Sequence, residues 1–453
     1  MKSRTSLCFA AIALFAALAI PVRLAAQGQP NQKPLRYAVQ DLGTLGGTFS
    51  IGRGINNKGW ATGNAFLRHD TAQHAVLWRT GRKIDLGTLG GPNSNTFWGP
   101  NERGQVAGQA ETSTPDPLGE DFCFFGTQLI CLPFLWQKGV MTALPTLGGN
   151  NGTATNINSR GRVVGLAENA TLDSTCPTSE YQAEAVIWEN GAVRELPTVS
   201  GDPDGYVSGV NDKGQTVGGS GDCAIGPAFS LHALLWQKDG TVTDLGNLGG
   251  SLYSGAVGVN DRGQVIGSSD LPGDTNFFAG PFSNTHGFFW ENGVIADLGT
   301  LPGDATSFPD AINNKGEVVG GGSRAVLWQN GVPRDLNTLV PGPPFSPLYL
   351  LDAFDINASG EIVGFGLAIN GDLHAFLATP CDEDHADVES CKQGAGVTAA
   401  EEPIQLETGT ESPSALTRGD PVLGGRFGGM LGRFRAPQSR EHQLPSLGSG
   451  PTR

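Results

Sequence analysis

The chain has 453 residues, a formal net charge of −15 and 67 glycines. The negative charge argues against nucleic acid as a partner. A charged fraction of only 16% together with so many glycines is typical of an all-β protein built from short strands and tight turns.

The amino-terminal end has the features of a secretory signal. Lys2 and Arg4 precede an uninterrupted apolar run over residues 7–20, and the small residues Ala25 and Ala26 follow. The run is too short to anchor the chain in a bilayer. We therefore predict a signal peptide over residues 1–26, a linker over 27–35 and export to the bacterial periplasm, cell surface or medium, with no membrane span.

Three short phrases recur from residue 41 onward. A DLGTLGG-like phrase occurs seven times, at 41–47, 85–91, 144–149, 196–201, 244–250, 297–303 and 335–342. An Asn-x-x-Gly turn also occurs seven times, at 56–59, 101–104, 158–161, 211–214, 260–263, 313–316 and 357–360. An apolar run, usually ending in Trp, lies at 74–78, 133–136, 185–188, 232–236, 286–290, 325–328 and 374–380. A period of roughly 40–60 residues indicates repeated supersecondary units.

Each unit reads as four short antiparallel strands. β-branched, Gly-bounded segments flank the Asn-x-x-Gly turn, in which Asn bonds its own backbone and Gly takes a positive φ. The apolar runs are long enough for a buried strand and too short for a helix. A last strand enters the DLG phrase. Seven such units predict a seven-bladed β-propeller over residues 36–380.

The order of the phrases predicts how the propeller closes. Residues 37–43 form a last-strand phrase with no unit before them, and the phrase at 374–377 has no last strand after it. The first segment would therefore complete the last blade, with the chain near Val39 beside the chain near Ala375. Such closure removes open sheet edges.

The segment 381–453 lies outside the repeats. It is acidic up to residue 420, then rich in Gly, Pro and Arg, and lacks the apolar content needed for a core. We predict that it is disordered.

Six cysteines remain after the signal peptide, and an even number in an exported protein favours disulfides. No Cys-x-x-Cys or paired His supports zinc instead. We predict the pairs Cys123–Cys131, Cys176–Cys223 and Cys381–Cys391.

Functional residues are expected where the units differ. The loops between the second and third strands are long in the second to fifth units, so one face is elaborated. Candidate binding residues on it are Phe122, Phe124, Phe125, Phe277, Phe278 and Phe282, as platforms for sugar rings or a protein. The alternative is that these rings fold back and fill their own loops.

Polar residues offer a second set of candidates. The carboxylates that break the repeat are Asp202, Asp204, Asp304 and Asp310, which could act as acid and base or as calcium ligands, or belong to ordinary turns. The repeated His74, His232, His286 and His374 lie in register, so they favour one structural hydrogen bond per unit over a metal site. The Asp that opens each DLG phrase fits an Asx-turn.

The three phrases together resemble a family of bacterial extracellular proteins with the His-Ala-Phe (HAF) repeat. His374–Phe376 matches the tripeptide, and near matches begin at His74, His232 and His286. The resemblance covers about residues 37–379 and implies a secreted repeat protein without a defined activity. The second, third and sixth units lack the His.

The sequence predicts a secreted binding module for an extracellular polysaccharide or a cell-surface protein, without a required cofactor. A carbohydrate-active hydrolase or lyase, and a structural scaffold of the envelope, are the alternatives.

Overall fold

The computed structural model describes residues 35–173, 180–222, 230–273, 284–340, 346–383, 385 and 391. Their named elements are β-strands and two short 3-10 helices, Arg68–Asp70 and Leu336–Leu339. The expected all-β class is confirmed. Within these ranges no helix is long and apolar enough to cross a membrane. The predicted signal peptide, all but the end of the linker and nearly all of the predicted disordered tail lie outside the described residues.

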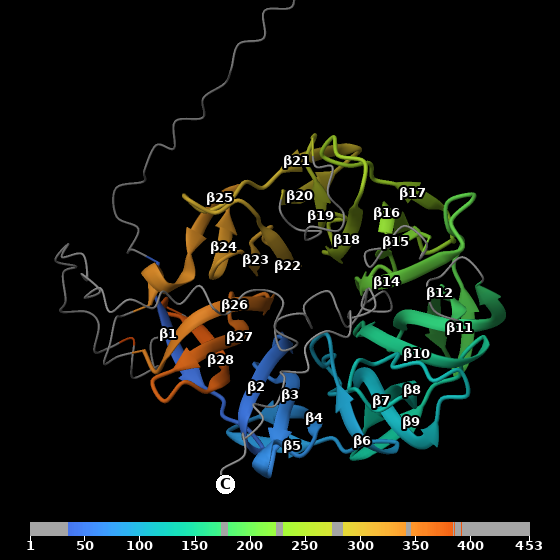
Figure 1. Cartoon of the computed structure of the whole chain (residues 1–453). Coiled ribbons are helices and arrows are strands. Elements are labelled where there is room, and N and C mark those ends of the chain that lie inside the picture. The colour runs from blue at the N-terminus through green and yellow to red at the C-terminus, as the bar shows by residue number, and fades with distance from the viewer. Residues whose placement is uncertain are drawn as a thin grey trace, which may run out of the picture. The chain divides into compact units, whose positions relative to one another are not determined.

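The strands form antiparallel four-stranded sheets whose strands follow the order of the chain (Figure 1). One sheet contains β6 (Gly90–Asn95), β7 (Val106–Pro115), β8 (Leu129–Gln137) and β9 (Val140–Ala143). The next contains β10 (Gly148–Ile157), β11 (Val163–Asp173), β12 (Glu180–Glu189) and β13 (Ala192–Glu195). A third contains β14 (Asp204–Val210), β15 (Thr216–Gly221), β16 (Ser230–Trp236) and β17 (Val242–Asp244).

Two further sheets repeat this pattern. One contains β18 (Ser254–Val259), β19 (Val265–Asp270), β20 (Thr285–Glu291) and β21 (Val294–Asp297). The other contains β22 (Phe308–Ile312), β23 (Val318–Gly321), β24 (Ala325–Gln329) and β25 (Val332–Asp335). The third strand of each sheet is the apolar run of the repeat, and the fourth ends at or near the DLG phrase.

An eight-stranded sheet holds the two ends of the repeat region. It combines β2 (Gly46–Ile55), β3 (Ala61–Leu67), β4 (Gln73–Arg79) and β5 (Arg82–Asp85) with β26 (Leu348–Ile356), β27 (Ile362–Ala368), β28 (Leu373–Pro380) and β1 (Tyr37–Asp41). A single parallel pair, Phe49 with Leu373, joins the two sets of four.

The amino-terminal strand completes the last set of strands. β1 pairs antiparallel with β28, with Val39 opposite Ala378 and Asp41 opposite Phe376, and Figure 1 shows the two strands side by side. The backbone N–H of Leu42 donates to the carbonyl of Ala375 over 2.9 Å. The predicted pairing of the two ends is therefore confirmed.

Neighbouring sheets pack through apolar faces rather than around one common core. Val164 and Ile187 of one sheet meet Val207, Leu234 and Trp236 of the next. Three of the tryptophans also contact the preceding unit, because their indole N–H groups donate to carbonyls in its DLG-type link, whereas the buried Trp328 Nε1 has no hydrogen-bond partner among the described residues. These bonds are Trp78 to Leu42 (3.0 Å), Trp188 to Pro145 (2.8 Å) and Trp236 to Pro197 (2.7 Å).

The Asn-x-x-Gly turns have the predicted local structure. In the first, Asn56 Oδ1 accepts the N–H groups of Lys58 (3.0 Å) and Trp60 (3.1 Å). Gly59 has a φ of 69°, a value that costs glycine nothing and most other residues about 1 kcal/mol. The side-chain oxygen thus caps the turn inside its own unit.

The side-chain amide nitrogen of each turn Asn makes a hydrogen bond that the sequence did not predict. It donates to the backbone carbonyl of the equivalent Asn in the next unit, at 2.9–3.2 Å. The donors in order are Asn56, Asn101, Asn158, Asn211, Asn260, Asn313 and Asn357, and Asn357 donates back to Asn56. All seven are buried, so these bonds are shielded from water.

Replacing one of these asparagines should destabilise the whole fold. Asn211 is 5% exposed and bonds Lys213, Gln215 and Asn260, so Asn211→Ala leaves several buried partners unsatisfied. We expect a loss of about 2–4 kcal/mol, measured as a lower urea midpoint. Lys213→Ala, at the exposed position of the same turn, is the control and should change stability by less than about 0.5 kcal/mol. Equal midpoints for the two variants would contradict this role.

Candidate functional site

The insertion between β7 and β8 is a long irregular loop that the structure describes in full. The disulfide Cys123–Cys131 ties it to β8. Asp116 Oδ1 accepts the N–H groups of Leu118 (2.7 Å) and Glu120 (3.2 Å), and Asp121 accepts the N–H of Gly126 at 3.0 Å. The loop is therefore fixed by its own covalent and polar bonds.

The buried side-chain amide of Asn151, in the neighbouring sheet, holds this loop in place. Asn151 is fully buried, and its Nδ2 lies 2.9 Å from Asp116 Oδ2, 2.8 Å from Glu120 Oε2 and 3.3 Å from Glu168 Oε2. Its Oδ1 accepts the N–H of Cys131 at 3.0 Å. Nothing in the repeat pattern pointed to this residue, because it occupies an ordinary position in β10.

The three aromatic rings of the insertion behave differently from one another. Phe122 is only 5% exposed, so its ring fills the loop, and its predicted role as an exposed platform is not supported. Phe124 and Phe125 are half-buried. Phe124 has a φ of 59°, a backbone conformation that costs on the order of 1–3 kcal/mol outside glycine and clusters at functional sites. Phe277, Phe278 and Phe282 lie outside the described residues.

The predicted disulfides can be followed in part. Cys381–Cys391 is present together with Cys123–Cys131. Cys176 and Cys223 lie outside the described residues, so that pair stays a prediction.

The repeated histidines each bond one carboxylate. Nδ1 of His74, His286 and His374 lies 2.8 Å from Asp85, Asp297 and Asp41, respectively. Those aspartates also accept the N–H of the glycine two residues on, as do Asp244 and, with Asn337 in place of the glycine, Asp335. In these units the His thus makes a structural bond to one carboxylate, as predicted, and the Asx-turn is confirmed for these aspartates.

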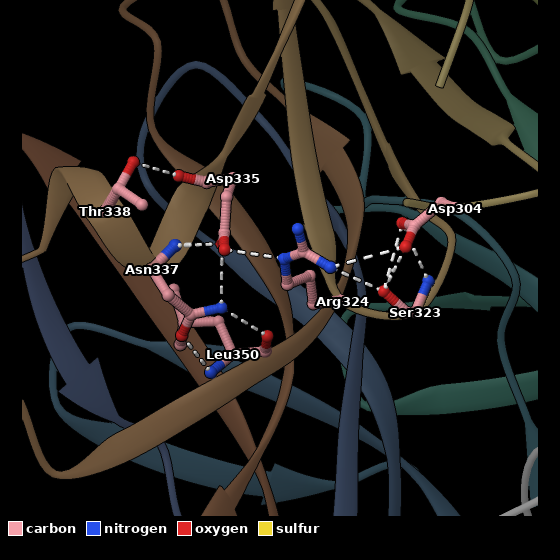
Figure 2. Close-up of polar contacts among 7 residues, drawn as sticks. All are labelled: Asp304, Ser323, Arg324, Asp335, Asn337, Thr338 and Leu350. Carbon is pink, nitrogen blue, oxygen red and sulfur yellow. Dashed lines mark hydrogen bonds and ion pairs between the residues drawn. The ribbon is translucent and has the colours of Figure 1, made fainter. Parts of the chain in front are cut away.

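The sixth unit replaces this His with Arg324, which joins two carboxylates (Figure 2). Arg324 Nε donates to Asp335 Oδ2 at 2.6 Å. Arg324 thus contacts the aspartate that is equivalent to the one bonded by the His in the first unit. Its Nη1 lies 3.4 Å from Asp304 Oδ1, and the Ser323 hydroxyl donates to the same oxygen at 2.8 Å. Asp304 is therefore held in an ion pair and is poorly placed to act as an acid or base.

Two of the other three candidate carboxylates also bond partners of their own. Asp202 Oδ2 lies 2.8 Å from His232 Nδ1 and accepts the Ser220 hydroxyl at 2.5 Å. Asp204 is 1% exposed and accepts the N–H of Ala183 at 2.9 Å. Asp310 is half-buried within β22. Asp202, Asp204 and Asp304 are therefore each held by a partner of their own, and none of these bonds joins two of the four candidates.

One carboxyl that sequence reasoning missed has unusual chemistry. Glu184 lies in β12 at the position where other units have His, opposite the strand that ends in Glu195. Burial raises its pKa to about 7, with the negative charges of Glu195 and Asp204 adding to the effect and a bond from Asn169 Nδ2 (2.8 Å) opposing it. The signal in the sequence was a Glu in the His position of the third repeat.

Among the described residues, no group of three or more His, Cys, Asp or Glu side chains has an arrangement that could hold a metal ion. Three of the four acidic residues considered as calcium ligands bond other groups: Asp202 bonds His232, Asp304 bonds Arg324 and Asp204 accepts a backbone N–H.

The Asn-x-x-Gly turns surround a cavity of about 240 Å³. Trp98 lines it together with the seven asparagines and the residues that follow them. The Trp98 indole also lies close to Gly258, three units away along the chain, since a Cβ built there would be 3.6 Å from its ring. The cavity thus has an aromatic wall and a polar rim.

Neither the scan against protein-family models nor the search of curated proteins finds a match for this chain. Among solved structures, the chain is similar to a streptogramin B lyase, with 9% identity, a TM-score of 0.45 and 76% of this chain and 98% of that chain covered. A Pyrococcus horikoshii acylaminoacyl peptidase gives 11% identity, a TM-score of 0.39 and coverage of 74% and 52%. An Aleuria aurantia lectin in complex with Fucα1-6GlcNAc gives 10% identity, a TM-score of 0.32 and coverage of 75% and 96%.

Proposed function

We propose that this chain is a secreted seven-bladed β-propeller of the HAF-repeat type and that it works as a binding module. The cyclic series of asparagine bonds supports seven blades, because each unit contributes one donor and the last returns to the first. The pairing of β1 with β28 supports closure by the amino-terminal strand. Two disulfides are compatible with export.

The observation that carries the binding role is the rigid insertion with Phe124 and Phe125. A platform that is already ordered loses little conformational entropy when it binds a ligand. Half-buried aromatic rings beside carboxylates suit the apolar faces and hydroxyl groups of sugars, or a protein surface. The ligand class we propose is an extracellular polysaccharide or a cell-surface protein, bound without a cofactor.

A second function has one specific observation in its favour. A carboxyl with a pKa of about 7 is protonated at neutral pH to an extent that suits a general acid, and Glu184 has Asp204 and Glu195 as neighbouring carboxylates. The alternative is therefore a carbohydrate-active hydrolase or lyase with Glu184 as the acid.

The binding role can be tested with a glycan array and a panel of cell-wall polysaccharides. Phe124→Ala combined with Phe125→Ala should reduce retention on the recognised ligand about tenfold or more, because it removes the stacking surface. The exposed Val294→Ala, on the outer strand β21, is the matched control and should bind as the wild type does. Undiminished retention by the double variant would show that the ligand does not bind at the proposed site.

Glu184→Gln tests the alternative by two readouts. The folded state binds the Glu184 proton more tightly than the unfolded chain, so the wild type loses stability as the pH rises from about 4.5 to about 7. Between these two pH values, the urea midpoint of the variant should therefore rise relative to that of the wild type. The midpoint of Glu383→Gln, at an exposed carboxyl, should not rise in this way.

The second readout is the release of reducing ends from the same polysaccharides. A hydrolase should lose about 100-fold or more of its rate in Glu184→Gln, and the wild-type rate should fall above pH about 7. If the wild type retains the polysaccharide without turning it over, the result supports the binding function and excludes the hydrolase or lyase.

A further inference from the structure

The cavity surrounded by the turns is built from layers to which every unit contributes one residue. The residues that follow the turn asparagines lie nearest the turn tips, and the asparagines form the next layer. The third layer is apolar in all seven units: Ile55, Pro100, Ile157, Val210, Val259, Ile312 and Ile356. Because each turn Asn uses Oδ1 in its own turn and Nδ2 toward the next unit, the wall offers few open hydrogen-bonding groups.

The innermost layer of the cavity departs from the repeat. Two positions before the turn Asn, four units have glycine and one has Ala311, whereas the third has Asn156 and the seventh has Asp355. Asn156 and Asp355 both line the cavity. Places where a chain breaks its own local pattern are expected at functional sites, so this layer is a candidate for one.

The second unit departs from the repeat in its first strand. In the other six units this strand continues to the residue before the turn Asn, but β6 ends at Asn95, six residues before Asn101. Asn93 and Asn151 are equivalent, since the Oδ1 of each accepts a backbone N–H of the preceding unit. Asn93 lies eight residues before its turn Asn and Asn151 lies seven before its own, so the second unit has one extra residue.

The irregular segment with this extra residue places Trp98 in the cavity. The Trp98 carbonyl accepts the Thr62 hydroxyl at 2.8 Å, so the first unit holds the segment in place. The half-buried ring lines the cavity and lies close to Gly258 of the fifth unit, and it packs on the apolar cluster that includes Ala311 and Ile356. An aromatic ring thus spans the cavity between units that are far apart along the chain.

Asp355 brings a buried carboxylate to the same cavity. It is 8% exposed, its Oδ2 accepts the N–H of Ile55 at 2.8 Å, and its Oδ1 accepts the N–H of Ile356 at 2.8 Å. Burial raises its pKa to about 7 in spite of these two bonds. The ion pairs of the described residues do not include Asp355, so no described cation is paired with its charge.

Among the described residues that line the cavity, every charged side chain is acidic. Besides Asp355, three carboxylates lie near the turn tips, each accepting a backbone N–H of a neighbouring unit: Glu102, Asp212 and Asp261. The lysine or arginine that precedes the glycine in six of the turns does not line the cavity. Arg53 stacks on the Phe354 ring at 4.5 Å and does not line it either. The lining therefore favours a cation.

We propose that this cavity binds a small quaternary ammonium compound, with the Trp98 ring against its methyl groups and the Asp355 carboxylate as its counter-charge. Such a cation has no N–H to donate, so it suits an apolar wall with few open acceptors, and its charge is attracted to an aromatic face. The volume of about 240 Å³ is below the roughly 300–1,000 Å³ of pockets for drug-sized ligands, which favours a small one.

The cavity is separate from the aromatic insertion. The turns between first and second strands lie at one end of the antiparallel sheets, and the loops between second and third strands lie at the other. The inference therefore does not depend on the ligand proposed for Phe124 and Phe125.

The test is isothermal titration calorimetry of the full-length protein with choline and with its uncharged isostere 3,3-dimethylbutan-1-ol. Both titrations contain about 0.15 M sodium chloride, which screens the general attraction of cations to a chain with a net charge of −15. We expect choline to bind with a Kd of about 1 mM or tighter, and the isostere to bind at least about tenfold more weakly. Equal affinities for the two compounds, or no binding of choline, would overturn the proposal.

A matched pair of tryptophan variants locates the site. Trp98→Leu should weaken choline binding about tenfold or more, because it removes the aromatic face, whereas Trp98→Phe should keep most of the affinity. The control is Trp60→Leu, since Trp60 is also half-buried near a turn but does not line the cavity, and Arg79 already stacks on it at 3.7 Å. A loss of choline binding in both leucine variants, or in neither, contradicts the assignment.

Asp355→Asn tests the counter-charge with little change of shape. Its affinity for choline should fall about tenfold while its affinity for the isostere stays the same. Urea midpoints report whether each variant folds, and the tryptophan pair decides the question if Asp355→Asn does not. Undiminished choline binding by folded Asp355→Asn would show that this carboxylate is not the counter-charge. The double variant of Phe124 and Phe125 should bind choline as the wild type does, which separates this inference from the proposed function.

Discussion

The hydrogen bond from each turn asparagine to the carbonyl of the next is the contact on which the rest of the structure depends. One side chain closes its own turn through Oδ1 and holds the neighbouring unit through Nδ2, as Asn211 does with Gln215 and Asn260. Aspartate cannot donate and alanine can do neither, so the position admits few substitutes. Local turn geometry and contact between units are therefore set by the same side chain, and distortion at one turn would reach its neighbours.

The sequence was sufficient for what repeats inside each unit. Strand order, the Asx-turns, the bonds of the histidines and the pairing near Val39 all follow from phrases that recur at fixed places. The sequence did not predict the contacts between units, because the repeat shows which residues each unit contains and not which atoms contact the next unit. Asn151 beneath the insertion and the pairing of His232 with Asp202, rather than with Asp244, are examples.

The irregular positions show how one site in a repeat acquires new chemistry. The place of His in the first unit is taken by Arg324 in the sixth and by Glu184 in the third. Arg324 keeps the bond to the aspartate at the end of the last strand, so the unit gains a permanent charge without losing its contact. Glu184 faces a strand that ends in another acid. Burial, and then the charges of Glu195 and Asp204, raise its pKa, and the bond from Asn169 offsets only part of this effect.

The buried amide of Asn151 also bears on how the protein can be made. Asn151-Gly152-Thr153 and Asn357-Ala358-Ser359 both read as acceptor sequences for N-linked glycans, yet each of these nitrogens is enclosed and donates a hydrogen bond in the folded chain. A sugar attached during translocation would occupy the atom that folding requires. Production in a eukaryotic secretory pathway would thus compete with folding at these two asparagines, whereas a host without oligosaccharyl transfer leaves them available.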